Sequence, residues 1–190
     1  MEKSNIHEKI KLLTGNGMWH TQETEDLPSV HLSDGPHGLR KQEEKERQNN
    51  VSLVSTCYPT ASALACSWDV TAAERLGRAV AKEAWNADVA VLLGPGINMK
   101  RSPLCGRNFE YFSEDPFLAG RLGAAYVSAA QGEDVAVSLK HFAANNQETN
   151  RQTSNSQIDE RALREIYLSA FEYVVKTARP ATIMASYNRL

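Results

Sequence analysis

The chain has 190 residues, of which 42% are hydrophobic and 23% charged, and its formal net charge is −2. This composition fits one globular domain, and the near-neutral charge gives no electrostatic footprint for nucleic acid or an anionic membrane. No apolar run approaches membrane-spanning length, and Met1–Ile10 contains no apolar signal region. The three cysteines lack CxxC spacing, which argues against a disulfide framework and a zinc site. We therefore expect a cytoplasmic protein without a metal or other cofactor.

The first 28 residues predict a short helix and a loop. Ser4–Thr14 reads as a helix that ends near Gly15 and carries one apolar face, made of Ile6, Ile10 and Leu13. The loop that follows, up to Pro28, contains Met18, Trp19 and His20. An aromatic residue in such a loop can line a pocket, but we favour the commoner role of covering the edge of the core.

A short strand is predicted over Ser29–Ser33, followed by a tight turn over Asp34–Arg40 that contains two glycines and a proline. The turn would hold the Asp34 carboxylate at the end of a strand, where it could accept two hydrogen bonds from neighbouring hydroxyls. A turn-initiating aspartate is the commoner local role. The mixed charges of residues 41–50 predict a solvated loop with no chemistry.

The middle of the chain predicts a strand over Ala61–Ala65 and a helix that begins at Thr71, with Glu74 completing a capping box. The buried face of this helix is expected to contain Ala72, Leu76, Val80, Ala84 and Ala87. Another buried strand follows over Val89–Leu93, and the glycines after it lack the lysine of a phosphate-binding loop.

The long connection over Asn98–Pro116 carries three aromatic residues, which argue against disorder. Arg107 and Glu110 are close enough to pair, and an arginine fixed by a carboxylate offers rigid donors to a ligand. A purely structural ion pair is the alternative. The next helix begins at Asp115-Pro116, with the proline in its first turn.

An apolar run over Val135–Leu139 predicts a buried strand, which stops abruptly at Lys140 and His141. Burying a lysine is costly unless its charge has partners. Since ligands bind at the carboxyl ends of parallel strands, both side chains are expected to face a site. The alternative is a lysine that reaches solvent and a histidine satisfied by a backbone carbonyl.

The remaining residues predict an amide-rich loop over Ala143–Arg151 and a helix between Asp159 and Pro180. The amides of the loop could bind a polar ligand or their own backbone. A last strand is expected over Ala181–Ser186, with Tyr187 directly after it.

Five strands alternating with helices predict an α/β fold with a parallel sheet, in the form of an incomplete (β/α)8 TIM-type barrel. Polar residues recur where these strands end, as expected for a barrel active site. A doubly wound open sheet would also fit the alternation, but its glycine-rich phosphate fingerprint is absent.

Four stretches in order resemble glycoside hydrolase family 3 of the bacterial β-glucosidase type. They are LSDGPHGLR from Leu32, GRNFEYFSEDP from Gly106, KHFAANNQETNR from Lys140 and MASYNRL from Met184. The resemblance covers residues 1–190 and implies the N-terminal part of the family's barrel domain. It implies that Asp34, Arg107, Lys140 and His141 hold the hydroxyls of the sugar, with Tyr187 near the reacting centre and Glu110 and Met184 in support.

In the family, the catalytic nucleophile lies in a Ser-Asp-Trp-like motif after a later strand, and the acid/base lies in a still later domain. The resemblance implies that both follow the stretch matched by this chain, so no residue here is assigned a catalytic role. The loop over Phe142–Arg151 has no His or Asp, which disfavours the β-N-acetylglucosaminidase branch. We expect a β-glucosidase-like fragment that binds glucose or a β-glucoside and is inactive alone. The alternative is a non-catalytic sugar-binding or assembly subunit that self-associates or needs a complementary C-terminal chain.

Overall fold

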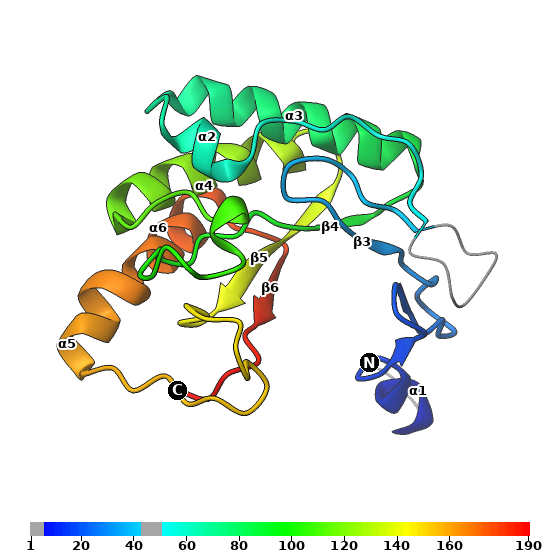
Figure 1. Ribbon diagram of the computed structural model, residues 1–190. Coiled ribbons are helices and arrows are strands. Elements are labelled where there is room, and N and C mark those ends of the chain that lie inside the picture. Colours follow the sequence, from blue (N-terminus) through cyan, green and yellow to red (C-terminus); the bar gives the residue numbers. More distant parts are fainter. Residues whose placement is uncertain (1–5, 43–50) are drawn as a thin grey trace.

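The computed structural model describes residues 6–42 and 51–190 (Figure 1). Its centre is a four-stranded parallel sheet with the order β3-β4-β5-β6. The strands are β3 (Leu32–Asp34), β4 (Val91–Leu93), β5 (Ala136–Phe142) and β6 (Thr182–Ala185). A separate antiparallel pair, β1 (Gly15–Asn16) and β2 (His20–Thr21), precedes the sheet.

Helices connect successive strands of the sheet, which confirms the predicted α/β alternation in a barrel that is not closed. The main helices are α2 (Ala61–Ala65), α3 (Val70–Asn86), α4 (Pro116–Gln131), α5 (Glu160–Ala162) and α6 (Ser169–Ala178). A 3₁₀ turn, η1 (Asn108–Glu110), lies before α4, and a π-helical turn, η2 (Leu163–Tyr167), joins α5 to α6. Helix α4 packs between α3 and α6, and the three lie along the same side of the sheet (Figure 1).

The core lies between this helical layer and the central strands. Leu92, Val137 and Leu139 on the strands are fully buried, as are Val80 on α3 and Leu122 on α4. Near-continuous apolar runs such as these are typical of parallel strands covered by helices. Because the strands are parallel, their four carboxyl ends lie at the same end of the sheet.

The structure corrects the prediction of a strand over Ala61–Ala65, which forms helix α2. Ala61, Leu64 and Ala65 are its buried residues, and this spacing matches one face of a helix. The side chain of Thr60 caps the helix by accepting a hydrogen bond from the backbone N–H of Ala63. A short apolar run does not distinguish a buried strand from a helix by itself, and here the cap and tertiary packing decide.

Helix α3 begins earlier than predicted, because Asp69 and not Thr71 provides its cap. The Asp69 carboxylate accepts a hydrogen bond from the Thr71 N–H at 2.8 Å. The buried face is shifted accordingly, so that Ala72 and Ala87 are only half-buried. It consists of Ala73, Leu76, Gly77, Val80, Ala81 and Ala84.

The N-terminal helix, α1 (Ile6–Lys11), is shorter than predicted and contributes no buried residue. Its apolar side chains are exposed, and Gly15 belongs to β1 instead of ending the helix. The local periodicity was present, but the helix has no core to cover. Of the predicted solvated loop, residues 43–50 lie outside the described residues, whereas Lys41 and Gln42 are half-buried.

Two other helix starts are confirmed. Asp115 caps α4 with Pro116 in the first turn, and Asp159 caps α5 by accepting from the Ala162 N–H at 2.9 Å. Strand β5 extends through Lys140 and His141 to Phe142 instead of stopping at Leu139. Within the described part of the chain, no helix has the length and apolar character needed to cross a membrane.

Candidate functional site

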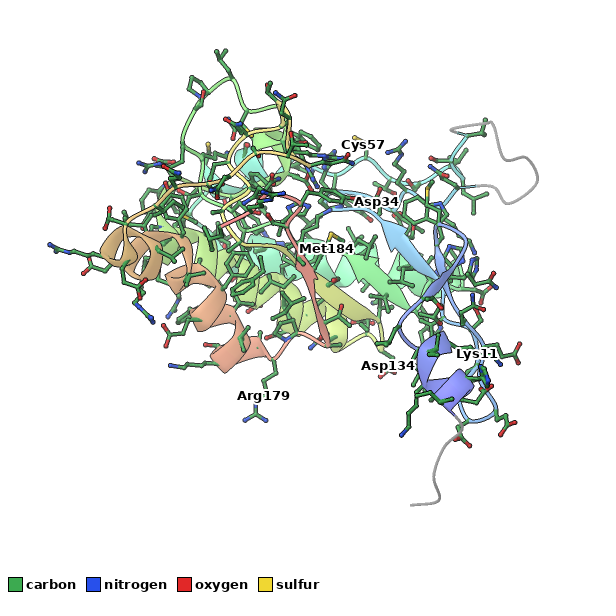
Figure 2. The ribbon with its side chains drawn as sticks, turned by 90° about the horizontal axis from the view of Figure 1, so that it is seen from below. Lys11, Asp34, Cys57, Asp134, Arg179 and Met184 are labelled. Atoms are coloured by element: carbon green, nitrogen blue, oxygen red, sulfur yellow. The ribbon has the colours of Figure 1, made fainter. Side chains whose placement is uncertain are left out.

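A pocket of about 750 Å³ lies at the carboxyl ends of the strands of the main sheet. It brings together all seven predicted site residues, which are Asp34, Arg107, Glu110, Lys140, His141, Met184 and Tyr187. Figure 2 shows Asp34 and Met184 at one end of the sheet, with Asp134 and Arg179 at the opposite end. Convergence from separate strands therefore puts these residues in one cavity, as the predicted topology requires.

The first wall of the pocket is the turn after β3. The Asp34 carbonyl accepts a hydrogen bond from the Arg40 N–H at 2.8 Å, which closes the turn. Gly38 has a φ of +151°, and a Cβ at this position would lie 2.3 Å from the Thr56 carbonyl oxygen. Glycine is therefore required here because the backbone approaches a neighbouring segment closely.

The second wall contains a buried group of three charges. Glu110 Oε2 lies 3.1 Å from Lys140 Nζ, and Glu110 Oε1 accepts from Arg107 Nε. Both Glu110 and Lys140 are 3% exposed, and Arg107 is 19% exposed. The predicted pairing of Arg107 with Glu110 is thus present, and the same carboxylate also partners Lys140.

The protonation of Glu110 follows from this arrangement. Burial by itself raises the pKa of the carboxyl, but Lys140 and Arg107 outweigh it and hold the pKa below its usual value. A carboxylate ionised in this way anchors two cations and cannot serve as a general acid at neutral pH. Its chemical role in the pocket is to hold the donors of Arg107 and Lys140 in place.

His141 is held by two buried side chains. Its backbone N–H donates to Asn98 Oδ1 at 2.7 Å, and its carbonyl accepts from Asn98 Nδ2 at 2.9 Å. Its Nδ1 lies 3.0 Å from the Tyr111 hydroxyl. Burial, followed by the charges of Arg107, Lys140 and Arg151, lowers the pKa of His141 to about 2, so the imidazole is neutral.

The amide-rich loop after β5 supports the pocket from inside the protein. Asn145 Nδ2 donates to the Tyr111 hydroxyl and to Glu148 Oε1, each at 3.0 Å. Glu148 Oε2 accepts from Arg151 at 2.7 Å, and the Arg151 guanidinium carbon lies 4.9 Å from the ring centre of Tyr187. The loop thus orders both the surroundings of His141 and the exposed ring of Tyr187.

Some pocket residues were missed or misjudged from the sequence. Trp19, predicted to cover the core edge, lines the pocket together with Met18, and its Nε1–H donates to Gln42 Oε1 at 3.1 Å. His37 and Phe109 also line it and meet edge to face, with ring centres 5.6 Å apart. Their positions in the Asp34 turn and beside Arg107 were the available signals.

The polar side chains of the pocket are hydrogen-bond donors and acceptors. Among the residues that the structure describes, no group of three or more His, Cys, Asp or Glu side chains could hold a metal ion. The pocket is instead lined by four cationic side chains, two carboxylates and two histidines, namely Arg40, Arg107, Lys140, Arg151, Asp34, Glu110, His37 and His141. Such a set suits a neutral ligand with several hydroxyl groups.

The model of the glycosyl hydrolase family 3 N terminal domain matches residues 33–190. The chain belongs to this family. Its curated relatives include thermostable beta-glucosidase B of Acetivibrio thermocellus, which is 50% identical over the whole of this chain. An exo-alpha-(1->6)-L-arabinopyranosidase of Bifidobacterium longum is 49% identical over 97% of the chain.

Solved structures of family 3 members have the same fold. Beta-glucosidase 3B from Thermotoga neapolitana in complex with glucose superposes with a TM-score of 0.89 at 39% identity and covers 98% of this chain. Beta-glucosidase from Kluyveromyces marxianus, also with glucose, gives 0.92 at 44% identity over 98% of the chain. The chain spans 28% and 22% of these two structures, and 26% of the Acetivibrio relative.

Proposed function

We propose that this family 3 chain forms the glycone-binding part of a β-glucosidase active site. The observation that carries the proposal is the convergence of Asp34, Arg107, Lys140 and His141 on one pocket at the strand ends. Hydroxyl groups of a pyranose would accept hydrogen bonds from the cations and donate to Asp34. Since charge-assisted hydrogen bonds are roughly twice as strong as neutral ones, such a set can orient a small sugar.

For a full-length enzyme of this family, the proposed reaction is the retaining hydrolysis of β-glucosides. This reaction needs a nucleophilic carboxylate and a carboxylic acid about 5–5.5 Å apart. Among the described residues, Asp34 and Glu110 are the carboxylates lining the pocket, and Glu110 is already paired with two cations. The 190-residue chain alone should therefore show no appreciable turnover of aryl β-glucosides, and robust turnover by the purified chain would contradict this assignment.

Binding of the glycone is tested by calorimetry with glucose. Asp34→Ala should abolish or strongly reduce the heat of binding, because it removes the acceptor at the end of β3. Asp26→Ala removes an exposed carboxylate outside the pocket and serves as the control. Equal heats from wild type and Asp34→Ala would remove Asp34 from the sugar site.

The identity of the glycone is a separate question, because the relatives include both glucosidases and an arabinopyranosidase. Both substrates are pyranosides, and arabinopyranose lacks the exocyclic hydroxymethyl group. A preference for glucose over L-arabinose in the same calorimeter would support the β-glucoside assignment. The reverse preference would replace it.

An assembly role is the second candidate, and the edge strands favour it. Strands β3 and β6 form the two edges of the sheet, and Ile183 in β6 is 46% exposed. An apolar edge strand invites pairing with another chain. Self-association, or binding of a complementary C-terminal chain, would cover it. Light scattering after size exclusion tests the first case, and a compact monomer would count against it.

A further inference from the structure

The buried side of His141 carries a hydrogen-bond chain that begins at Glu148. A carboxylate only accepts hydrogen bonds, so the Asn145 atom 3.0 Å from Glu148 Oε1 must be the amide nitrogen. The same nitrogen lies 3.0 Å from the Tyr111 hydroxyl oxygen and donates to it. Asn145 Oδ1 is left buried without a partner among the described residues, so both hydrogen bonds of this amide are made by its nitrogen.

The Tyr111 hydroxyl, having accepted from Asn145, still has a proton to donate. Within the described residues, its remaining partner is His141 Nδ1, at 3.0 Å. Tyr111 is fully buried, and burial raises the pKa of its hydroxyl, so that the proton is retained. If His141 carried its own proton on Nδ1, the tyrosine proton would have no acceptor among the described residues, which is unfavourable for a fully buried hydroxyl.

A second acceptor offers the opposite arrangement. Asn98 Oδ1 lies 3.3 Å from His141 Nδ1, but it already accepts the His141 backbone N–H at 2.7 Å. The choice between the two forms of the imidazole thus depends on Tyr111. With the hydroxyl present, Nδ1 accepts; without it, an Nδ1–H could donate to Asn98.

We propose that Tyr111, oriented by Asn145 and Glu148, is a positioning residue that keeps the proton of His141 on Nε2. Nδ1 faces the buried Tyr111, so Nε2 is the ring nitrogen available to the pocket that His141 lines. His141 then presents a neutral N–H donor to a sugar oxygen. The sugar as ligand rests on the proposed function, whereas the position of the proton does not.

The direct test is nitrogen NMR of the 190-residue chain labelled with ¹⁵N-histidine. The chain has five histidines, and the His141 signals are assigned by their loss in His141→Gln. In wild type, the His141 Nε2 should carry the proton and Nδ1 should be bare. A wild-type His141 with its proton on Nδ1 would overturn the proposal without recourse to any variant.

Tyr111→Phe removes the hydroxyl alone and should move the proton of His141 to Nδ1, at least in part. Tyr126→Phe is the matched control, because Tyr126 is fully buried and its hydroxyl has no partner within the described residues. That variant should keep the wild-type signals. If Tyr111→Phe folds and still shows Nε2–H alone, the positioning role is wrong.

Glucose affinity gives the functional readout. It should fall roughly tenfold in Tyr111→Phe, the cost of losing about one hydrogen bond, and stay unchanged in Tyr126→Phe. Equal affinities for wild type and Tyr111→Phe would remove the link between the proton position and the sugar. Absence of glucose binding to wild type would contradict the proposed function. The positioning role of Tyr111 would then be decided by the NMR experiment alone.

Discussion

Glu110 Oε2 and Lys140 Nζ lie 3.1 Å apart, and each side chain is only 3% exposed. The lysine comes from strand β5, whereas the carboxylate comes from the 3₁₀ turn in the long loop before α4. This contact therefore fastens the loop that contains η1 to the carboxyl end of β5. The contact also stabilises the buried Lys140, because an unpaired charge at this depth would be strongly unfavourable.

Replacing Glu110 should destabilise the protein severely. Glu110→Gln leaves Lys140 and Arg107 without their common anion, and breaking a buried pair typically costs about 3–5 kcal/mol. Urea denaturation measures the change in the free energy of unfolding. Glu165→Gln breaks an exposed pair with Arg161 on the surface and should have little effect. Equal stabilities for the two variants would show that the Glu110 cluster is solvated.

The stability of the fold should decrease as the pH falls below 6.5. The pKa of His141 is lowered from 6.5 to about 2 in the folded chain, so below pH 6.5 the unfolded chain binds a proton there and the folded chain does not. This group contributes a loss of up to about 1.4 kcal/mol per pH unit. Unfolding in urea between about pH 7.5 and pH 5 measures it.

Two histidine variants test whether this pH dependence comes from His141. His141→Gln should flatten the slope over that range, whereas His7→Gln, on the exposed α1, should keep it. Glu110 adds a second loss at lower pH, because its pKa lies below 4.5 in the folded chain. Its stabilisation begins to decrease as the pH drops below 4.5 and is lost as the pH falls through the lower pKa of the folded chain. An unchanged slope in His141→Gln would show that another group is responsible.

Gly38→Ala should distort the Asp34 turn. The added Cβ would meet the Thr56 carbonyl oxygen at 2.3 Å, so one of the two segments must move. We expect a loss of roughly 2–4 kcal/mol in stability together with weaker glucose binding. Gly17→Ala also adds a Cβ at positive φ but in open space, and should cost only about 1–2 kcal/mol. If both variants cost the same, the close approach is not what requires glycine.

Ile183→Lys tests the exposed edge of the sheet. A lysine on an edge strand disfavours pairing with a second chain, because its charge would have to be desolvated. If the wild-type chain self-associates through β6, the variant should shift it toward monomer in light scattering at equal concentration. Val175→Lys, on the 39% exposed position in α6, tests for a general effect of added charge. An unchanged association state in Ile183→Lys would exclude β6 as the interface.

Much of the fold was available from local sequence patterns. Asp115-Pro116 and Asp159 fixed two helix starts, since a cap needs only the residues next to it. The run before Lys140 predicted the central strand, although not that it extends to Phe142. Ala61–Ala65 was assigned wrongly, because a five-residue segment of the sequence ASALA fits either a strand or one turn and a half of helix.

The candidate site was likewise predictable from the sequence only in part. The sequence by itself determined which residues lie near strand ends. A short apolar run is typical of a buried strand, and the polar Lys140 and His141 that follow it mark the end of that run. Only the tertiary structure decided that Glu110 reaches Lys140, that Trp19 enters the pocket, and that Tyr111 stands behind His141. The physical reason is distance along the chain. Glu110 and Lys140 are 30 residues apart, as are Tyr111 and His141, and Trp19 lies farther still from strand β5, so only the packing of the folded chain brings these groups together.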